Sequence, residues 1–223
     1  MIKHRKAFIT GIKGTVLTKR EKNFLNKNKP WGIILFSRNI KNFNQIKKLT
    51  SDIRKIFKDK KYPILIDQEG GRVNRLNKFI DTSLFSGKYF GKLFLNDKKK
   101  FFSDYSFFIE KICNILNDIG VNINTVPVLD LYKKNSSSVI GDRAYSSRSK
   151  IVSKIGDFCI KTFSKQKIGT VIKHIPGHGL AKVDSHKLTP TVYTNSKILF
   201  KNFFNFFKKK KSFFSMTAHI IYK

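Results

Sequence analysis

Three of the chain's five histidines lie within residues 173–186, together with two glycines and one acidic residue. Asp184 precedes His186 by two residues. A carboxylate that accepts a hydrogen bond from one ring nitrogen fixes the tautomer of the imidazole and favours its protonated form. Such a pair can serve as a general acid or base. The alternative is a glycine-rich surface loop with solvated histidines, but this crowding of functional side chains favours an active-site loop.

The segment before these histidines predicts where they stand in the fold. Residues 168–172 are short, apolar and β-branched, which is typical of a buried strand. Lys173 and His174 follow at its carboxyl end. Because two polar side chains leave a buried strand together, we expect at least one of them to face a polar cavity.

A second candidate site follows residues 63–66, another predicted strand. Asp67 comes directly after this strand, and two glycines that permit close backbone approach come soon after. A carboxylate there can accept hydrogen bonds from neighbouring hydroxyls of a sugar, although it could also cap the next element. Of the nearby Arg72 and Arg75, we expect one to be functional, and the other could pair with Glu69.

The remaining polar residues near strand ends give weaker indications. Asp142 and Arg143 are equally compatible with a site and with a surface ion pair. Asp130 is interpreted as a turn cap, and His178, between two glycines, as support for its loop. His219 ends a further predicted strand and could line the same cavity as Lys173.

The chain alternates predicted strands and helices, which indicates an α/β fold with a parallel sheet. Strands are expected at residues 7–10, 32–36, 63–66, 121–128, 168–172 and 213–219, and helices at 18–28, 40–56, 100–118, 151–164 and 196–207; residues 76–99 are expected to be irregular. Functional side chains of such folds gather at the carboxyl ends of the strands. A (β/α)₈ barrel needs roughly 250 residues. We therefore expect residues 1–223 to form one domain, a barrel with about six of the eight strands: either the sequence is truncated at its carboxyl end or the fold is an incomplete barrel.

The formal net charge of +32 invites a nucleic-acid-binding interpretation. Only eight of the 46 basic residues are arginine, and the lysines are dispersed along the chain, so we expect weak non-specific binding to polyanions at most. Cys113 and Cys159 lie in apolar helical contexts and are interpreted as buried thiols, not metal ligands. No signal peptide and no membrane span of about 18 apolar residues is found.

Several motifs, taken in order and spacing, resemble glycoside hydrolase family 3. They are IDQEGGRVNR (residues 66–75), VIGDR (139–143), KHIPGHG (173–179), VDSH (183–186) and MTAH (216–219). GIILFSRN (32–39) and GVNINTVPV (120–128) fit the same pattern. The similarity runs from about residue 10 to the end of the sequence, and it is closest to the bacterial cytoplasmic β-N-acetylglucosaminidases of peptidoglycan recycling.

The resemblance implies a TIM-type barrel and a retaining glycosidase that removes terminal, non-reducing β-linked N-acetylglucosamine from muropeptide fragments. It assigns acid/base catalysis to His186, with Asp184 as its partner. It assigns sugar binding to five residues: Asp67, Arg75, Arg143, Lys173 and His174. It implies a cytoplasmic protein, which we expect to be a monomer, without a metal, another cofactor, a specific nucleic acid or a membrane as partner.

Two departures from the family pattern qualify this expectation. Leu180 and Ala181 replace an acidic residue and a threonine, outside the matched ligands. The family's nucleophilic aspartate lies beyond the strand that ends near His219, and no matching residue occurs in this sequence. A retaining mechanism needs that carboxylate, so we expect negligible turnover by the chain as given. The alternative function is a non-catalytic sugar-binding remnant of the same fold.

Overall fold

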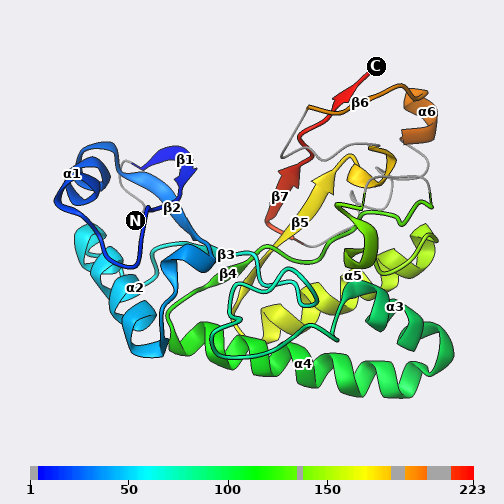
Figure 1. The fold of residues 1–223 in the computed structure, drawn as a ribbon, viewed down its shortest axis with the longest axis horizontal. Coiled ribbons are helices and arrows are strands. Elements are labelled where there is room, and N and C mark those ends of the chain that lie inside the picture. Colours follow the sequence, from blue (N-terminus) through cyan, green and yellow to red (C-terminus); the bar gives the residue numbers. More distant parts are fainter. Residues whose placement is uncertain (1–4, 135–137, 182–188, 200–211) are drawn as a thin grey trace.

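The centre of the protein is a parallel six-stranded sheet in the order β1-β2-β3-β4-β5-β7 (Figure 1). The computed structural model describes residues 5–134, 138–181, 189–199 and 212–223. The strands of the sheet are β1 (Lys6–Thr10), β2 (Pro30–Leu35), β3 (Ile64–Ile66), β4 (Ile123–Asn124), β5 (Gly169–Ile175) and β7 (Phe214–Thr217). The short strands β6 (Thr191–Val192) and β8 (Ile221–Tyr222) form a separate parallel pair near the carboxyl end.

Helices follow the strands in the predicted β-α alternation. The longer ones are α1 (Lys19–Asn28), α2 (Phe43–Phe57), α3 (Gly87–Asn96), α4 (Lys98–Asp118) and α5 (Ser149–Lys165). Single helical turns are η1 (Ser37–Asn39), η2 (Gly141–Arg143), η3 (His178–Leu180) and α6 (Ser196–Leu199). The sheet is curled, with β1 and β2 on one side, β5 and β7 on the other, and helices on its outer face (Figure 1). This is an incomplete TIM-type barrel, as predicted.

Local signals place the first helix where the sequence predicts it. The Thr18 hydroxyl accepts a hydrogen bond from the Glu21 N–H at 3.2 Å, and the Glu21 carboxylate accepts one from the Thr18 N–H at 2.9 Å. This capping box satisfies two backbone donors at the start of α1. The predicted strand at 121–128 is shorter than expected, since only Ile123–Asn124 pairs as a strand. The part of the predicted helix 196–207 after residue 199 lies outside the described residues.

The two faces of the sheet carry different apolar cores. The outer face and the helices form the larger core, which includes Ile64, Ile66 and Ile172. The inner face carries Leu65, Ile123 and Val171, with three partly buried residues packed against them: Trp31, Ile34 and Met216. The Trp31 ring of β2 also meets the Phe214 ring of β7, with 5.0 Å between ring centroids. The curl of the sheet therefore brings an early strand and a late strand into contact across its inner face.

The prediction that residues 76–99 are irregular is wrong, because they include helix α3. The two glycines of α3 lower its helix propensity, which hides it in the sequence. Packing explains their presence. A Cβ atom on Gly87 would stand 2.1 Å from the Arg143 carbonyl oxygen, and one on Gly91 would stand 1.7 Å from the Tyr145 carbonyl oxygen. The helix lies directly against the backbone of residues 143–145, and only glycine permits this approach.

Both cysteines are buried free thiols, as predicted. Burial raises the pKa of Cys113 and that of Cys159 to about 12. Because the thiolate is the reactive species, we expect neither cysteine to react with a thiol reagent in the native protein at pH 8. Labelling followed by mass spectrometry should show modification only after denaturant is added. Rapid labelling of the native protein would contradict the burial of these side chains.

None of the helices in the described part of the chain combines the length and apolarity that a membrane crossing requires.

Candidate active site

Strand alternation places a polar layer on the inner face of the sheet, at its carboxyl end. Successive side chains of a strand point to opposite faces, so residues two apart share a face. Each polar residue stands two positions after an inner-core residue: Asp67 after Leu65, Thr125 after Ile123 and Lys173 after Val171. The polar layer therefore rests directly on the inner apolar core.

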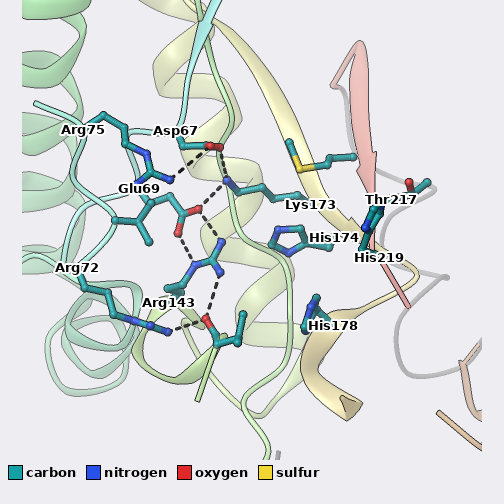
Figure 2. A pocket seen from close by; sticks show the side chains of 13 residues that line it. Asp67, Glu69, Arg72, Arg75, Arg143, Lys173, His174, His178, Thr217 and His219 are labelled. Carbon is teal, nitrogen blue, oxygen red and sulfur yellow. Dashed lines mark hydrogen bonds and ion pairs between the residues drawn. The ribbon is translucent and has the colours of Figure 1, made fainter. Parts of the chain in front are cut away.

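Lys173 is the central residue of this layer and is 2% exposed. Its Nζ atom lies 2.9 Å from an Asp67 oxygen and 2.6 Å from a Glu69 oxygen (Figure 2). It also donates a hydrogen bond to the Thr125 hydroxyl at 2.9 Å, and that hydroxyl donates to Asp67. One buried ammonium is thus held by two carboxylates and a hydroxyl, which use all three of its donors.

Glu69 connects Lys173 to Arg143 on η2. The Nε and Nη2 atoms of Arg143 each donate to one Glu69 oxygen at 2.8 Å, which is a bidentate pair (Figure 2). The Glu69 side chain is 7% exposed and that of Arg143 is 12% exposed. The polar layer and the loop that carries Arg143 are therefore joined by one buried carboxylate.

The other two arginines occupy different positions at the cavity. Arg75 approaches Asp67, with 3.7 Å between Nη2 and a carboxylate oxygen. Arg72 is about half exposed, pairs with Asp142 at 2.8 Å and donates to the carbonyl oxygens of Ser138 and Val139. The interpretation that Arg72 or Arg75 pairs with Glu69 is therefore wrong. The Glu69 carboxylate pairs with Lys173 of β5 and Arg143 of η2 instead.

His174 lines the same cavity, and its ring is hydrogen-bonded to Asp130. The His174 Nδ1 atom lies 2.6 Å from one Asp130 oxygen, and the His178 N–H donates to the other. Asp130 is fully buried. Its two oxygens thus contact residues 174 and 178, far along the chain from the turn that Asp130 is expected to cap, and one of these contacts is to an imidazole that lines the cavity.

These side chains line a cavity of about 560 Å³ at the carboxyl ends of the strands. Its lining includes all five residues expected to bind a sugar: Asp67, Arg75, Arg143, Lys173 and His174. Other side chains on its wall are Glu69, Arg72, His178 and His219 (Figure 2). The expected acid/base pair, Asp184 and His186, lies outside the described residues.

The electrostatics of the cavity keep its two acidic side chains ionised. Burial alone would raise the pKa of Glu69, but the charges of Lys173 and Arg143 outweigh it and lower that pKa to about 2. Burial likewise opposes ionisation of Asp67, whereas Lys173 and the Thr125 hydrogen bond hold its pKa below the ordinary value. Burial disfavours the charged form of Arg143, but the Glu69 charge outweighs burial and raises its pKa. The cavity therefore offers fixed charges of both signs, which suits a neutral polyhydroxylated ligand.

Sequence reasoning missed the site positions of Glu69, Thr125 and Asp130. Thr125 could have been found from its inward register, two residues after Ile123. Asp130 stands where polar residues gather, near the end of a predicted strand. Nothing in the sequence shows that Glu69 prefers Lys173 and Arg143 over the arginines closer to it in the chain.

Comparison with known proteins identifies relatives along nearly the whole chain. A model of the glycosyl hydrolase family 3 N terminal domain matches residues 9–223. Beta-hexosaminidase A of Pseudoalteromonas piscicida is 33% identical over 199 residues, which cover 86% of this chain and 33% of that protein. The beta-hexosaminidase of Hydrogenovibrio crunogenus is 33% identical over 175 residues, 78% of this chain and 48% of that protein. The chain thus spans about half, or less, of these relatives.

Solved structures of similar proteins also match nearly the whole chain. NagZ from Neisseria gonorrhoeae, in complex with N-trifluoroacetyl-D-glucosamine, superposes with a TM-score of 0.88 at 28% identity. The match covers 98% of this chain and 65% of that one. A glycoside hydrolase family 3 beta-N-acetylglucosaminidase from a Paenibacillus strain gives a TM-score of 0.80 at 25% identity and covers 96% and 41% of the two chains.

Proposed function

This chain belongs to glycoside hydrolase family 3. On this basis we propose that it is the sugar-binding part of a retaining β-N-acetylhexosaminidase. The reaction is removal of terminal, non-reducing β-linked N-acetylglucosamine from peptidoglycan-derived fragments. The names of the relatives support this activity, and a glucosamine derivative is bound in one of the similar structures. We further propose that the protein is a cytoplasmic monomer whose residues 1–223 form one domain.

The observation that carries the proposal is the buried ion network at the carboxyl end of the sheet. Asp67 keeps one oxygen on Lys173 and Thr125, and its other oxygen is 3.7 Å from Arg75. That second oxygen can accept hydrogen bonds from ligand hydroxyls. Arg75, Arg143, Lys173 and His174 would surround the sugar, since all of them line the same cavity.

We assign proton transfer to His186, with Asp184 orienting its ring. An imidazole paired with a carboxylate can give a proton to the leaving oxygen and later take one from water. A histidine in this role departs from the carboxylic acid that most glycosidases use. The glycines of residues 177–179 precede this pair in the chain and suit a loop that closes over the substrate.

Asp67→Asn tests the proposal, because it removes the negative charge of a side chain that we expect to bind the sugar and keeps the shape of that side chain. A charged hydrogen bond contributes about 1.5–3 kcal/mol, so we expect the affinity for N-acetylglucosamine to fall roughly 10- to 100-fold. Titration calorimetry or ligand-observed NMR measures the change.

Asp59→Asn is the matched control. Asp59 also pairs with an arginine, Arg5, but it precedes β3, whereas Asp67 follows it. Its replacement should leave sugar affinity within a factor of about two. Equal affinities of the wild-type protein and Asp67→Asn would refute the assigned role of Asp67, and no binding by the wild-type protein would refute the proposed function.

A further inference from the structure

The backbone beside β5 brings a buried acid next to a histidine of the cavity. Val128 pairs with Lys173 in a parallel bridge, and the Leu129 N–H donates to the Lys173 carbonyl at 2.7 Å. Residues 128–130 therefore run alongside residues 173 and 174. This register places Asp130 directly beside His174, where the carboxylate meets the ring.

Both oxygens of Asp130 are engaged. One lies 2.6 Å from the His174 Nδ1 atom, and the other accepts the His178 N–H. An ionised carboxylate can only accept hydrogen bonds, so the Nδ1 atom must carry a hydrogen. In a ring with a single proton, Nε2 is then left as an acceptor on the opposite edge. His174 lines the cavity, so this acceptor is available to a ligand.

We propose that Asp130 is a positioning residue that fixes His174 as a hydrogen-bond acceptor toward the bound sugar. This inference rests on the proposed function. Lys173 and Arg143 can only donate, and they are engaged with Asp67 and Glu69. While the ring holds a single proton, a sugar hydroxyl that must donate its hydrogen therefore finds an acceptor in the Nε2 atom of His174.

The tautomer of His174 can be read without any ligand. Long-range ¹H–¹⁵N correlation of the imidazoles distinguishes protonated from unprotonated ring nitrogens, and the signals that vanish in His174→Gln identify His174. We expect Nδ1 to carry the hydrogen and Nε2 to be bare in the wild-type protein, at a pH where the ring holds one proton. The opposite tautomer would overturn the proposal, and this measurement requires no Asp130 variant to fold.

Asp130→Asn should reverse the tautomer. The His178 N–H needs an acceptor and takes the single amide oxygen, so the amide NH₂ group faces Nδ1. Nδ1 must then accept, and the hydrogen moves to Nε2. Asp142→Asn is the control: it removes a charge from Asp142, which pairs with Arg72, and it should leave the wild-type tautomer. An unchanged tautomer in Asp130→Asn would contradict the inference.

Sugar titration then tests the consequence. With Nε2 turned into a donor, a hydrogen bond to the sugar is lost, and we expect N-acetylglucosamine affinity to fall about tenfold or more in Asp130→Asn. Wild-type affinity despite a reversed tautomer would overturn the positioning role. A wild-type protein that shows the expected tautomer but does not bind the sugar would instead refute the proposed function, so the two failures are distinguishable.

Discussion

Replacing Glu69 with alanine should lower the free energy of unfolding by about 3–5 kcal/mol, the usual cost of leaving buried charges without their partner. Glu69 is the shared counter-ion of Lys173 and Arg143, and all three side chains are largely buried. Without Glu69, Arg143 loses its bidentate partner, and Lys173 keeps one carboxylate, that of Asp67, beside the Thr125 hydroxyl. Urea denaturation monitored by circular dichroism measures the change.

Glu110→Ala is the control, because Glu110 is an exposed glutamate on α4. Its replacement should change the free energy of unfolding by less than about 0.5 kcal/mol. Equal stability of the Glu69 and Glu110 variants would show that the ion network of the cavity does not stabilise the fold.

The same residue predicts how stability depends on pH. The pKa of Glu69 is about 2 in the folded protein, below its ordinary value of 4.5. The unfolded state therefore binds the proton more readily. The stability that the fold gains from the ionised Glu69 beside Lys173 and Arg143 is therefore fully present above pH 4.5. It is lost as the pH falls toward 2. Glu69→Gln should flatten the stability curve within that window, and a curve parallel to that of the wild-type protein would contradict the lowered pKa.

Gly91→Ala should destabilise the protein by about 3 kcal/mol or more, at the upper end of what overpacking costs. The new methyl group would meet the Tyr145 carbonyl oxygen at 1.7 Å, and backbone cannot swing aside as a flexible side chain can. Helix α3 would have to move away from residues 143–145. Thermal unfolding measures the loss of stability, and the displacement of Arg143 should also weaken sugar binding.

Gly14→Ala is the matched control, because a Cβ atom at Gly14 would meet nothing within 4 Å. It should leave stability within about 0.5 kcal/mol of the wild-type protein. If the Gly91 and Gly14 variants unfold at the same temperature, the close packing of α3 on the backbone of residues 143–145 would be refuted.

Local signals in the sequence predicted the elements that depend on local interactions. Thr18 and Glu21 mark the start of α1 because they satisfy each other's backbone donors. The apolar runs before Asp67 and Lys173 become β3 and β5, and the two residues then meet at the same end of the sheet. Strand ends of a parallel sheet gather at one edge, so these site residues could be found without knowing any contact.

What the sequence could not predict depends on contacts between distant segments. Gly91 weakens the helical signal of α3, and the reason for it is a carbonyl oxygen 54 residues later in the chain, at Tyr145. Asp130 resembles a turn cap until the register of residues 128–130 against β5 sets it beside His174. Glu69 pairs with Lys173 and Arg143 and not with Arg72 or Arg75, which are closer to it in the chain. This pairing likewise depends on the curl of the sheet.

Trp31 gives this fold a built-in optical probe. It is the sole tryptophan of the chain, and its ring packs on Phe214 across the inner face of the sheet. The indole emission therefore reports whether the second strand and the last strand of the sheet remain together. Because the cavity lies at the carboxyl ends of the strands and Trp31 stands near the start of β2, loosening of the sheet can be followed by fluorescence separately from ligand binding in the cavity.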